Sequence, residues 1–269
     1  LYPSPPGSPA NIPGLEVAGE VTAVGRQVTR FSVGDPVMAL LGGGGQAEIA
    51  AVDESHALGV PEGVSWPAAG GLPEAFCTAF DALFTQAGLG SGERLLVTGA
   101  AGGVGTAAVQ LGTLAGATVV ASVRDPSRRD EVAGLAGCEA IDPAEVADRG
   151  PYDVVLELVG AASFPSALET LGIGGRIVVI GIGSGGRVEL ELGRVMATRA
   201  RISGSTLRAR DRAAKAAVVE GVRRHVLAHL AAGRIAVPIC ATYPFADAGL
   251  AYERFEAGGK LGKIVLVPG

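Results

Sequence analysis

From residue 94 onward, apolar residues fall in short runs separated by turns and amphipathic stretches, a pattern that predicts alternating strands and helices. We expect a long helix over residues 213–232 and strands over residues 95–98, 118–122, 153–158, 176–180 and 201–205. Strands that alternate with helices favour a parallel sheet covered on both faces. The pattern therefore predicts an α/β fold with a doubly wound parallel sheet.

The region before residue 94 has a different pattern, with short apolar runs broken by Gly and Pro. Residues 16–24 and 31–41 are predicted to form short strands, and residues 46–52 continue this β-rich region. Residues 73–84 form a predicted helix that begins at Pro73 and leads into the second region. A last strand, within residues 260–267, is expected to rejoin the first region.

A glycine motif marks the start of the α/β region. The apolar run 95–98 leads into Gly99, Gly102 and Gly105, and an Ala-rich helical stretch follows. This order brings a dinucleotide pyrophosphate against a helix N-terminus, where free N–H groups and the helix dipole favour negative charge. The spacing G-x-x-G-x-x-G is weak evidence alone and also fits a tight turn without a ligand.

The end of the next strand indicates which dinucleotide would bind. NAD-binding folds place an acid near this point, whereas this chain has Arg124, with Ser122 before it and Arg128 after it. A hydroxyl and guanidinium groups suit a 2′-phosphate, so we expect NADPH. Two alternatives stay open: a shift of one residue would put Asp125 on the ribose, and the arginines could belong to a solvated turn.

Composition excludes several classes of function. The 269 residues carry a net charge of −5, which provides no basic face for nucleic acid. Residues 95–123 carry no charge, but their glycines and strand–turn–helix–strand pattern predict a buried βαβ unit rather than a membrane span. The proline-rich start shows no signal peptide, and Cys77, Cys138 and Cys240 have no metal or redox spacing. We therefore expect a cytoplasmic protein.

Several pieces together resemble the quinone oxidoreductase (zeta-crystallin-like) branch of the medium-chain dehydrogenase/reductase superfamily. The resemblance is carried by residues 2–3, 12–21, 33–37, 72–78, 100–105, 156–160, 203–208 and 262–266. It begins partway into the family's catalytic domain. It implies a partial catalytic GroES-like domain at 1–76 plus 237–269, and an NADP-binding Rossmann domain at 77–236. Homodimers are common in the family, and the alternating run within residues 181–192 is a plausible edge for pairing.

The resemblance also implies functional residues. Tyr2 matches a tyrosine that borders the substrate pocket, and Thr78 matches a threonine that faces the cofactor. The nicotinamide would lie against small residues after two strands, whose alternative role is that of ordinary turns. The expected cofactor-binding residues are Thr78, Ala101, Gly102, Gly103, Val104, Ser122, Arg124, Arg128, Val159, Gly160, Gly181, Ile182, Gly183, Leu207, Arg208 and Lys263.

Two departures from related families shape the expected chemistry. Zinc-dependent relatives carry His where this chain has Leu15, and the four-cysteine lobe of a structural zinc is missing, so no metal is expected. Relatives often stack an aromatic residue on the adenine where this chain has Asp142 and Pro143. The expected activity is NADPH-dependent, zinc-free reduction of a quinone or enone. The alternatives are an enoyl or acryloyl thioester reductase, or a non-catalytic NADPH-binding protein.

Overall fold

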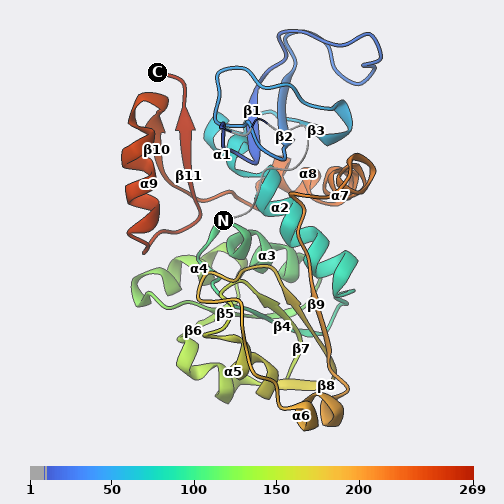
Figure 1. The fold of residues 1–269 in the computed structure, drawn as a ribbon, viewed down its shortest axis with the longest axis vertical. Helices are drawn as coiled ribbons and strands as arrows, with labels where there is room; N and C mark the ends of the chain where they lie inside the picture. Colours follow the sequence, from blue (N-terminus) through green and yellow to red (C-terminus); the bar gives the residue numbers. More distant parts are fainter. Residues whose placement is uncertain (1–8, 10) are drawn as a thin grey trace. The chain divides into compact units, whose positions relative to one another are not determined.

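The computed structural model describes residue 9 and residues 11–269, which divide into two compact units (Figure 1). The first unit comprises the chain up to Cys77 together with Thr206–Gly258 and Lys263–Gly269. The second comprises Thr78–Ser205 and Gly259–Gly262. The sequence placed the second boundary at residue 236, whereas residues 206–236 group with the first unit. The reason is that α7 (Arg212–His225) packs against η1 (Glu54–His56) and β3 (Ala57–Gly59).

The second unit is built on a six-stranded sheet. Its spatial order is β6-β5-β4-β7-β8-β9, and all neighbours are parallel, which confirms the predicted doubly wound fold. The strands are β4 (Arg94–Val97), β5 (Thr118–Ser122), β6 (Glu139–Ile141), β7 (Tyr152–Glu157), β8 (Leu171–Val179) and β9 (Arg201–Gly204). Strand order changes direction between β4 and β7, and a sheet of this kind binds ligands at the carboxyl ends beside that point.

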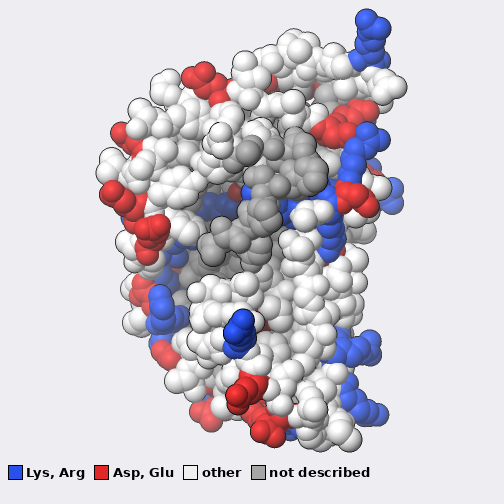
Figure 2. Space-filling model, viewed as in Figure 1, with Lys and Arg blue, Asp and Glu red and all other residues white. Residues whose placement is uncertain are grey.

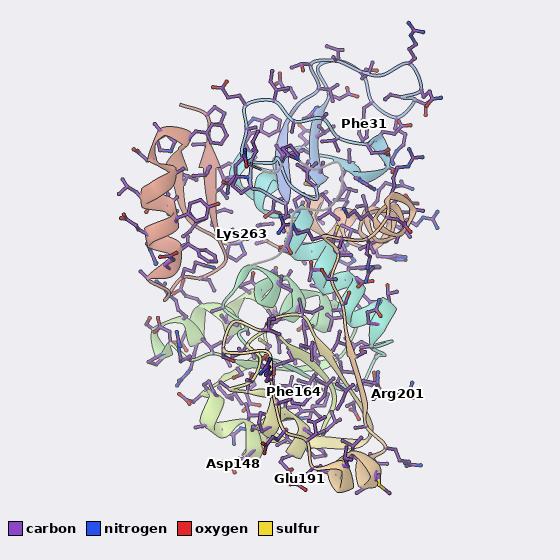
Figure 3. The ribbon with its side chains drawn as sticks, viewed as in Figure 1. Phe31, Asp148, Phe164, Glu191, Arg201 and Lys263 are labelled. Atoms are coloured by element: carbon purple, nitrogen blue, oxygen red, sulfur yellow. The ribbon has the colours of Figure 1, made fainter. Side chains whose placement is uncertain are left out.

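Helices cover both faces of this sheet (Figure 1). On one face lie α3 (Gly103–Leu114) and α4 (Arg129–Ala136), and on the other lie η4 (Pro143–Arg149), α5 (Phe164–Glu169) and α6 (Leu192–Thr198). The core beneath α5 includes Tyr152, Leu96 and Ile177, and Phe164 points into it from the helix (Figure 3). On the α3 face the helix approaches closely because Gly112 lacks a side chain: a Cβ there would lie 2.7 Å from Leu95.

The uncharged run 95–123 forms the β4–α3–β5 unit, as predicted. Among the described residues, no helix has the length and hydrophobicity needed to span a bilayer.

The first unit contains two small sheets. One is antiparallel, with β1 (Glu16–Glu20), β2 (Pro36–Leu40) and β3 in that order, and the other pairs β10 (Ile239–Pro244) with β11 (Lys263–Val267) in parallel. Helix α1 (Trp66–Gly71) packs on strands of both sheets, and α9 (Ala248–Glu256) packs on β10 and β11. The last strand therefore joins the first unit, as the sequence indicated.

Some predicted elements were wrong. Residues 46–52 form no strand, because the loop just before them is held locally: the amides of Gly44, Gly45 and Gln46 donate to carbonyls of residues 12–14. Residues 186–191 form no strand either, and the edge strand of the large sheet is β9. The helix predicted at 213–232 breaks at Val226 into α7 and α8 (Leu227–Ala231).

The bridging helix also departs from the regular form expected. Helix α2 (Pro73–Phe80) continues as η2 (Asp81–Gln86), a π-helical segment in which the amide of Ala87 donates to the carbonyl of Ala82. The buried Asp81 carboxylate accepts a hydrogen bond from the Ser205 hydroxyl at 2.7 Å.

Candidate cofactor site

The glycine turn brings the end of β4 to the start of α3. The chain reverses at Gly99, whose φ is +61°, and the amide of Ala100 donates to the carbonyl of Ser122 at 3.2 Å. The N-cap of α3 is Gly102, which offers no side chain to the first turn. The N-terminal amides of a helix that lacks a side-chain cap are available to an anion, and the helix dipole favours one. The turn places Ala101, Gly102, Gly103 and Val104 at this helix end.

Different structural constraints apply at the three glycines of the motif. A Cβ on Gly105 would lie 2.6 Å from both the Ala100 Cα and the Gly99 carbonyl oxygen, so the fold requires glycine there. Gly99 requires it through its positive φ. Gly102 has φ −74° and ψ 171°, and a Cβ would meet only the Gly99 carbonyl oxygen at 3.4 Å. Packing therefore makes a weaker demand for glycine at 102 than at 99 or 105, and the missing side chain leaves the α3 N-terminus open to a close ligand.

The end of β5 carries the residues expected to read a 2′-phosphate. Ser122 is buried, whereas the Arg124 side chain is exposed and has no hydrogen bond to other described residues. Arg128 is paired with Glu131 at 2.6 Å and also donates to the carbonyl of Gly259. Arg129 donates to the Val123 carbonyl and pairs with Asp142. Arg124 is therefore the guanidinium best able to meet a ligand.

Asp125, the alternative ribose acceptor, has another structural role. Its carboxylate caps η3 (Pro126–Arg128) by accepting hydrogen bonds from the Ser127 hydroxyl at 2.7 Å and the Ser127 amide at 3.0 Å. These bonds, with smaller contributions from Arg128 and Arg124, lower the pKa of Asp125. Both capping bonds fall on Oδ1, so the turn orients the carboxylate, and its Oδ2 has no hydrogen bond to the other described residues.

Two further turns at the same sheet edge carry the residues expected near the nicotinamide. Gly160 has φ +106°, and a Cβ there would lie 2.7 Å from the carbonyl oxygen of Gly185. A Cβ on Gly181 would lie 2.1 Å from the carbonyl oxygen of Leu158. The turn after β7 thus packs tightly against the turn after β8, which places Val159 and Gly160 beside Gly181–Gly183. Local packing alone explains the glycines at 160 and 181.

Residues 259–262 join this unit from a distant part of the sequence. Gly262 pairs with Gly102 in an isolated β-bridge, and its amide donates to the Ala101 carbonyl at 2.8 Å. The Lys260 ammonium donates to the Gly262 carbonyl at 3.1 Å. A basic side chain therefore lies close to the glycine turn. Sequence reasoning missed it, although the glycines at 258, 259 and 262 around Lys260 were a visible signal.

Four other predicted residues belong to α2 or to the first unit. Thr78 is buried on α2. Leu207 and Arg208 belong to the first unit, where Leu207 is buried and the Arg208 Nε donates to the Gly42 carbonyl at 3.2 Å. Lys263 begins β11 in the first unit (Figure 3). Tyr2 lies outside the described residues.

The Lys263 ammonium is held by carboxylates of its own unit. It pairs with Glu16, and a Glu74 oxygen lies 3.9 Å away. Burial lowers the pKa of Lys263, but attraction to Glu16 and Glu74 outweighs burial and raises it above its ordinary value. An ammonium held in this way is engaged before any phosphate arrives, which is a structural role that the sequence did not indicate.

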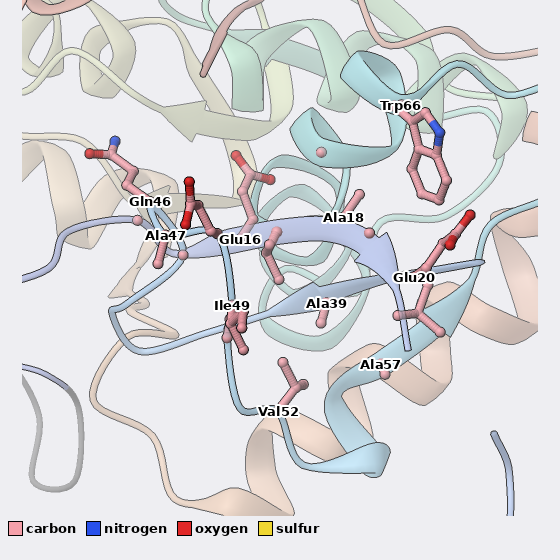
Figure 4. Close-up of a pocket in the computed structure, with 18 of the residues that line it drawn as sticks. Glu16, Ala18, Glu20, Ala39, Gln46, Ala47, Ile49, Val52, Ala57 and Trp66 are labelled. Carbon is pink, nitrogen blue, oxygen red and sulfur yellow. The ribbon is translucent and has the colours of Figure 1, made fainter. Parts of the chain in front are cut away.

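The first unit also contains a hollow of about 1130 Å³ (Figure 4). Its labelled walls carry mostly small apolar side chains, with Trp66, Gln46 and the carboxylates of Glu16 and Glu20. Of the predicted site residues that the structure describes, Lys263 alone lines it. Within the described part of the chain, no three His, Cys, Asp or Glu side chains are grouped to hold a metal.

On the face shown in Figure 2, the charged side chains do not gather into one patch of a single sign. Acidic and basic groups are interspersed there (Figure 2). Several basic groups are also neutralised by short-range pairing, as where Arg223 and Arg224 both bond to Glu220.

Comparisons with known proteins agree with this architecture. Residues 2–62 match the alcohol dehydrogenase GroES-like domain family, and residues 103–220 match the zinc-binding dehydrogenase family. A chloroplast envelope quinone oxidoreductase homolog of Arabidopsis thaliana is 39% identical over 185 residues, covering 63% of this chain and 56% of the relative. The polyketide synthase GfsB of Streptomyces halstedii is 36% identical over 186 residues, covering 67% of this chain and 3% of the relative.

Two solved structures are similar along nearly the whole chain. A quinone oxidoreductase from Pseudomonas syringae shares 28% identity with a TM-score of 0.84, covering 100% of this chain and 85% of that chain. A mycobacterial protein complexed with NADPH shares 26% identity with a TM-score of 0.83, covering 95% of this chain and 82% of that chain. The matches to the curated relatives span about half of their length, or far less for the polyketide synthase.

Proposed function

The chain belongs to the quinone oxidoreductase branch of the medium-chain dehydrogenase/reductase superfamily, and we propose that it is an NADPH-dependent reductase of quinones or α,β-unsaturated carbonyls that works without zinc. One observation carries the proposal. At the carboxyl edge of a parallel sheet, a glycine turn leads into an α3 N-terminus without a side-chain cap, and the exposed Arg124 follows the adjacent strand.

The residues present fit a dinucleotide. The Gly102 position leaves a ligand room to approach the backbone, and the amides at the start of α3 would hold the pyrophosphate. Lys260 adds a positive charge beside the turn. Bound NADPH supplies a hydride from its nicotinamide, while the chain binds it, orients it and limits water around it.

The preference for NADPH over NADH rests on charge. Arg124 presents a guanidinium that is not committed to another described residue, while the neighbouring Asp125 carboxylate is oriented by Ser127 through its Oδ1. A guanidinium binds a phosphate through charge-assisted hydrogen bonds. The mycobacterial neighbour that binds NADPH supports the same choice of cofactor.

A second candidate function is reduction of an enoyl or acryloyl thioester. The similarity to a polyketide synthase favours it, since 67% of the chain is matched there at 36% identity. A third is NADPH binding without catalysis. A panel of acceptors separates the three. We would mix the protein with NADPH and follow its oxidation with quinones, enones and enoyl thioesters in parallel.

Each result of that panel has a defined meaning. Oxidation by quinones or enones supports the proposal, and oxidation by thioesters alone supports the second candidate. Tight NADPH binding with no oxidation by any acceptor supports the non-catalytic role. Failure to bind either NADPH or NADH would refute all three.

The proposal includes a homodimer and a cytoplasmic location. Strand β9 is the edge of the large sheet, and all four of its residues are exposed. A two-fold copy could add its own β9 there and continue the sheet. The three cysteines are free thiols, which suits a reducing compartment.

A further inference from the structure

A heavily hydrogen-bonded buried carboxylate of the second unit lies directly below the candidate cofactor site. Glu157 is the last residue of β7 and is completely buried. Its Oε1 accepts four hydrogen bonds, from the Val159 amide at 2.7 Å, the Gly160 amide at 2.8 Å, the Ser163 hydroxyl at 2.7 Å and the Thr98 hydroxyl at 2.9 Å. The Oε2 atom is buried and has no partner among the described residues.

These bonds connect different turns. Thr98 immediately precedes the glycine turn after β4, and Val159 and Gly160 form the turn after β7. The backbone carbonyl of Glu157 adds a third connection, because it accepts from the amides of Ile180 at 2.9 Å and Gly181 at 3.1 Å after β8. One residue therefore contacts all three turns that carry the predicted pyrophosphate and nicotinamide residues.

The arrangement is more specific than ordinary core packing requires. A strand at this depth is usually filled by an apolar side chain, and a buried carboxylate is costly unless donors surround it. Here two backbone amides and two hydroxyls converge on one oxygen. A group with this many bonds to separate segments fixes their relative positions, and small misplacements at a reaction site cost about 100-fold in rate.

We propose that Glu157 is a positioning residue that sets the spacing of the three turns beneath the nicotinamide half of NADPH. This inference rests on the proposed function. It does not give Glu157 a contact with the cofactor. Its effect is exerted through Thr98, through the 159–160 amides and through the start of the 180–183 segment.

The test compares a whole cofactor with its adenosine half. Affinities for NADPH and for 2′,5′-ADP would be measured by titration calorimetry on the native chain, on Glu157→Gln and on Glu157→Asp. We expect both variants to bind NADPH roughly tenfold or more weakly, while binding of 2′,5′-ADP changes less than twofold. Gln keeps an accepting oxygen but loses the charge, and Asp keeps the charge but is one methylene shorter.

Hydrogen exchange provides a readout without a ligand. In Glu157→Gln the amides of residues 158–161 and 180–183 should exchange faster together, while those of 119–123 on β5 keep their rates. The matched control is Glu93→Gln. Glu93 is a partly buried glutamate at the opposite end of the sheet, bonded to Arg176 and to the Gly90 amide. This control should leave both affinities unchanged.

Each outcome decides the inference. Equal weakening of NADPH and 2′,5′-ADP, or no change in either, would overturn it. If Glu157→Gln does not fold, Ser163→Ala removes one donor and should give the same pattern with a smaller effect. If the native chain binds neither nucleotide, the proposed function fails and the inference fails with it. Native binding that Glu157→Gln does not alter overturns the inference alone.

Discussion

In the glycine turn, we expect Gly105 to be required for folding and Gly102 to be required for binding the cofactor, and two substitutions can distinguish these roles. The two perturbations are Gly102→Ala and Gly105→Ala, which add the same single methyl group three residues apart. At 105 the new Cβ would lie 2.6 Å from the backbone of Ala100. At 102 its nearest neighbour is the Gly99 carbonyl oxygen, at 3.4 Å.

These distances give different magnitudes for stability. Overpacking against backbone at 105 costs about 3 kcal/mol, offset by about 1 kcal/mol of improved helix propensity. We therefore expect Gly105→Ala to lower Tm by about 4 °C or more. At 102 a weaker N-cap and a less flexible unfolded chain oppose each other, so stability should change by less than about 1 kcal/mol.

The affinity for NADPH should respond differently from stability: Gly102→Ala, which should change stability little, should weaken NADPH binding. A methyl group at the helix N-cap would push the pyrophosphate away from the first-turn amides. Losing one charge-assisted hydrogen bond costs about 2 kcal/mol, which is roughly 30-fold in Kd. The assays are differential scanning fluorimetry for Tm and fluorescence titration for NADPH. A Gly102→Ala protein that binds NADPH as tightly as the native chain would refute the ligand reason for this glycine, and one that unfolds would refute the packing analysis.

Four further results are expected. Arg124→Ala should weaken NADPH by about 1–3 kcal/mol and leave NADH nearly unchanged in parallel titrations; equal losses would contradict the 2′-phosphate role. The hydrogen bond from Arg176 chiefly lowers the pKa of Glu93, so this stabilisation should be complete above the ordinary carboxyl pKa of about 4 and fall away as pH drops through the lowered value. Urea midpoints of the native chain and Glu93→Gln would then converge in acid, and a constant gap would count against the pairing. Activity should survive chelators, with well under one zinc per chain by elemental analysis; stoichiometric zinc would show that the Leu15 argument fails. Light scattering should report a dimer that a proline at Ile202 in β9 disrupts, and a monomer would exclude this edge as the interface.

The large sheet could be predicted from the sequence because its signals are local. Strands β4, β7 and β8 are apolar runs followed within three residues by Gly, and buried parallel strands need little else. The glycine motif likewise identified the turn between β4 and α3. The strands predicted near residues 46 and 190 were wrong, because apolar alternation alone cannot specify a pairing partner. Among the described residues, neither segment pairs with another strand.

The candidate site was predictable only in part. Arg124 was visible because it follows a strand where another residue type is usual. Glu157 was not, since a single acid at the end of an apolar run does not reveal which donors will surround it. Lys260 was missed for a related reason: its place beside Gly102 depends on a bridge between residues 160 positions apart. The resemblance implied a cofactor-binding role for Lys263; its ion pairs with Glu16 and Glu74 were not visible in the sequence, because those carboxylates come from two distant segments.

The Lys263 ion pair has a consequence for the order in which a nascent chain acquires its structure. Both carboxylate partners emerge from the ribosome before their counterion, which follows Glu74 by nearly 190 residues. At typical elongation rates this delay lasts on the order of 10–40 seconds. The second unit draws almost entirely on residues between these two points, so its sheet can form during the interval. The first unit must meanwhile hold two acids without their cation, and its completion waits for the final strand to be synthesised.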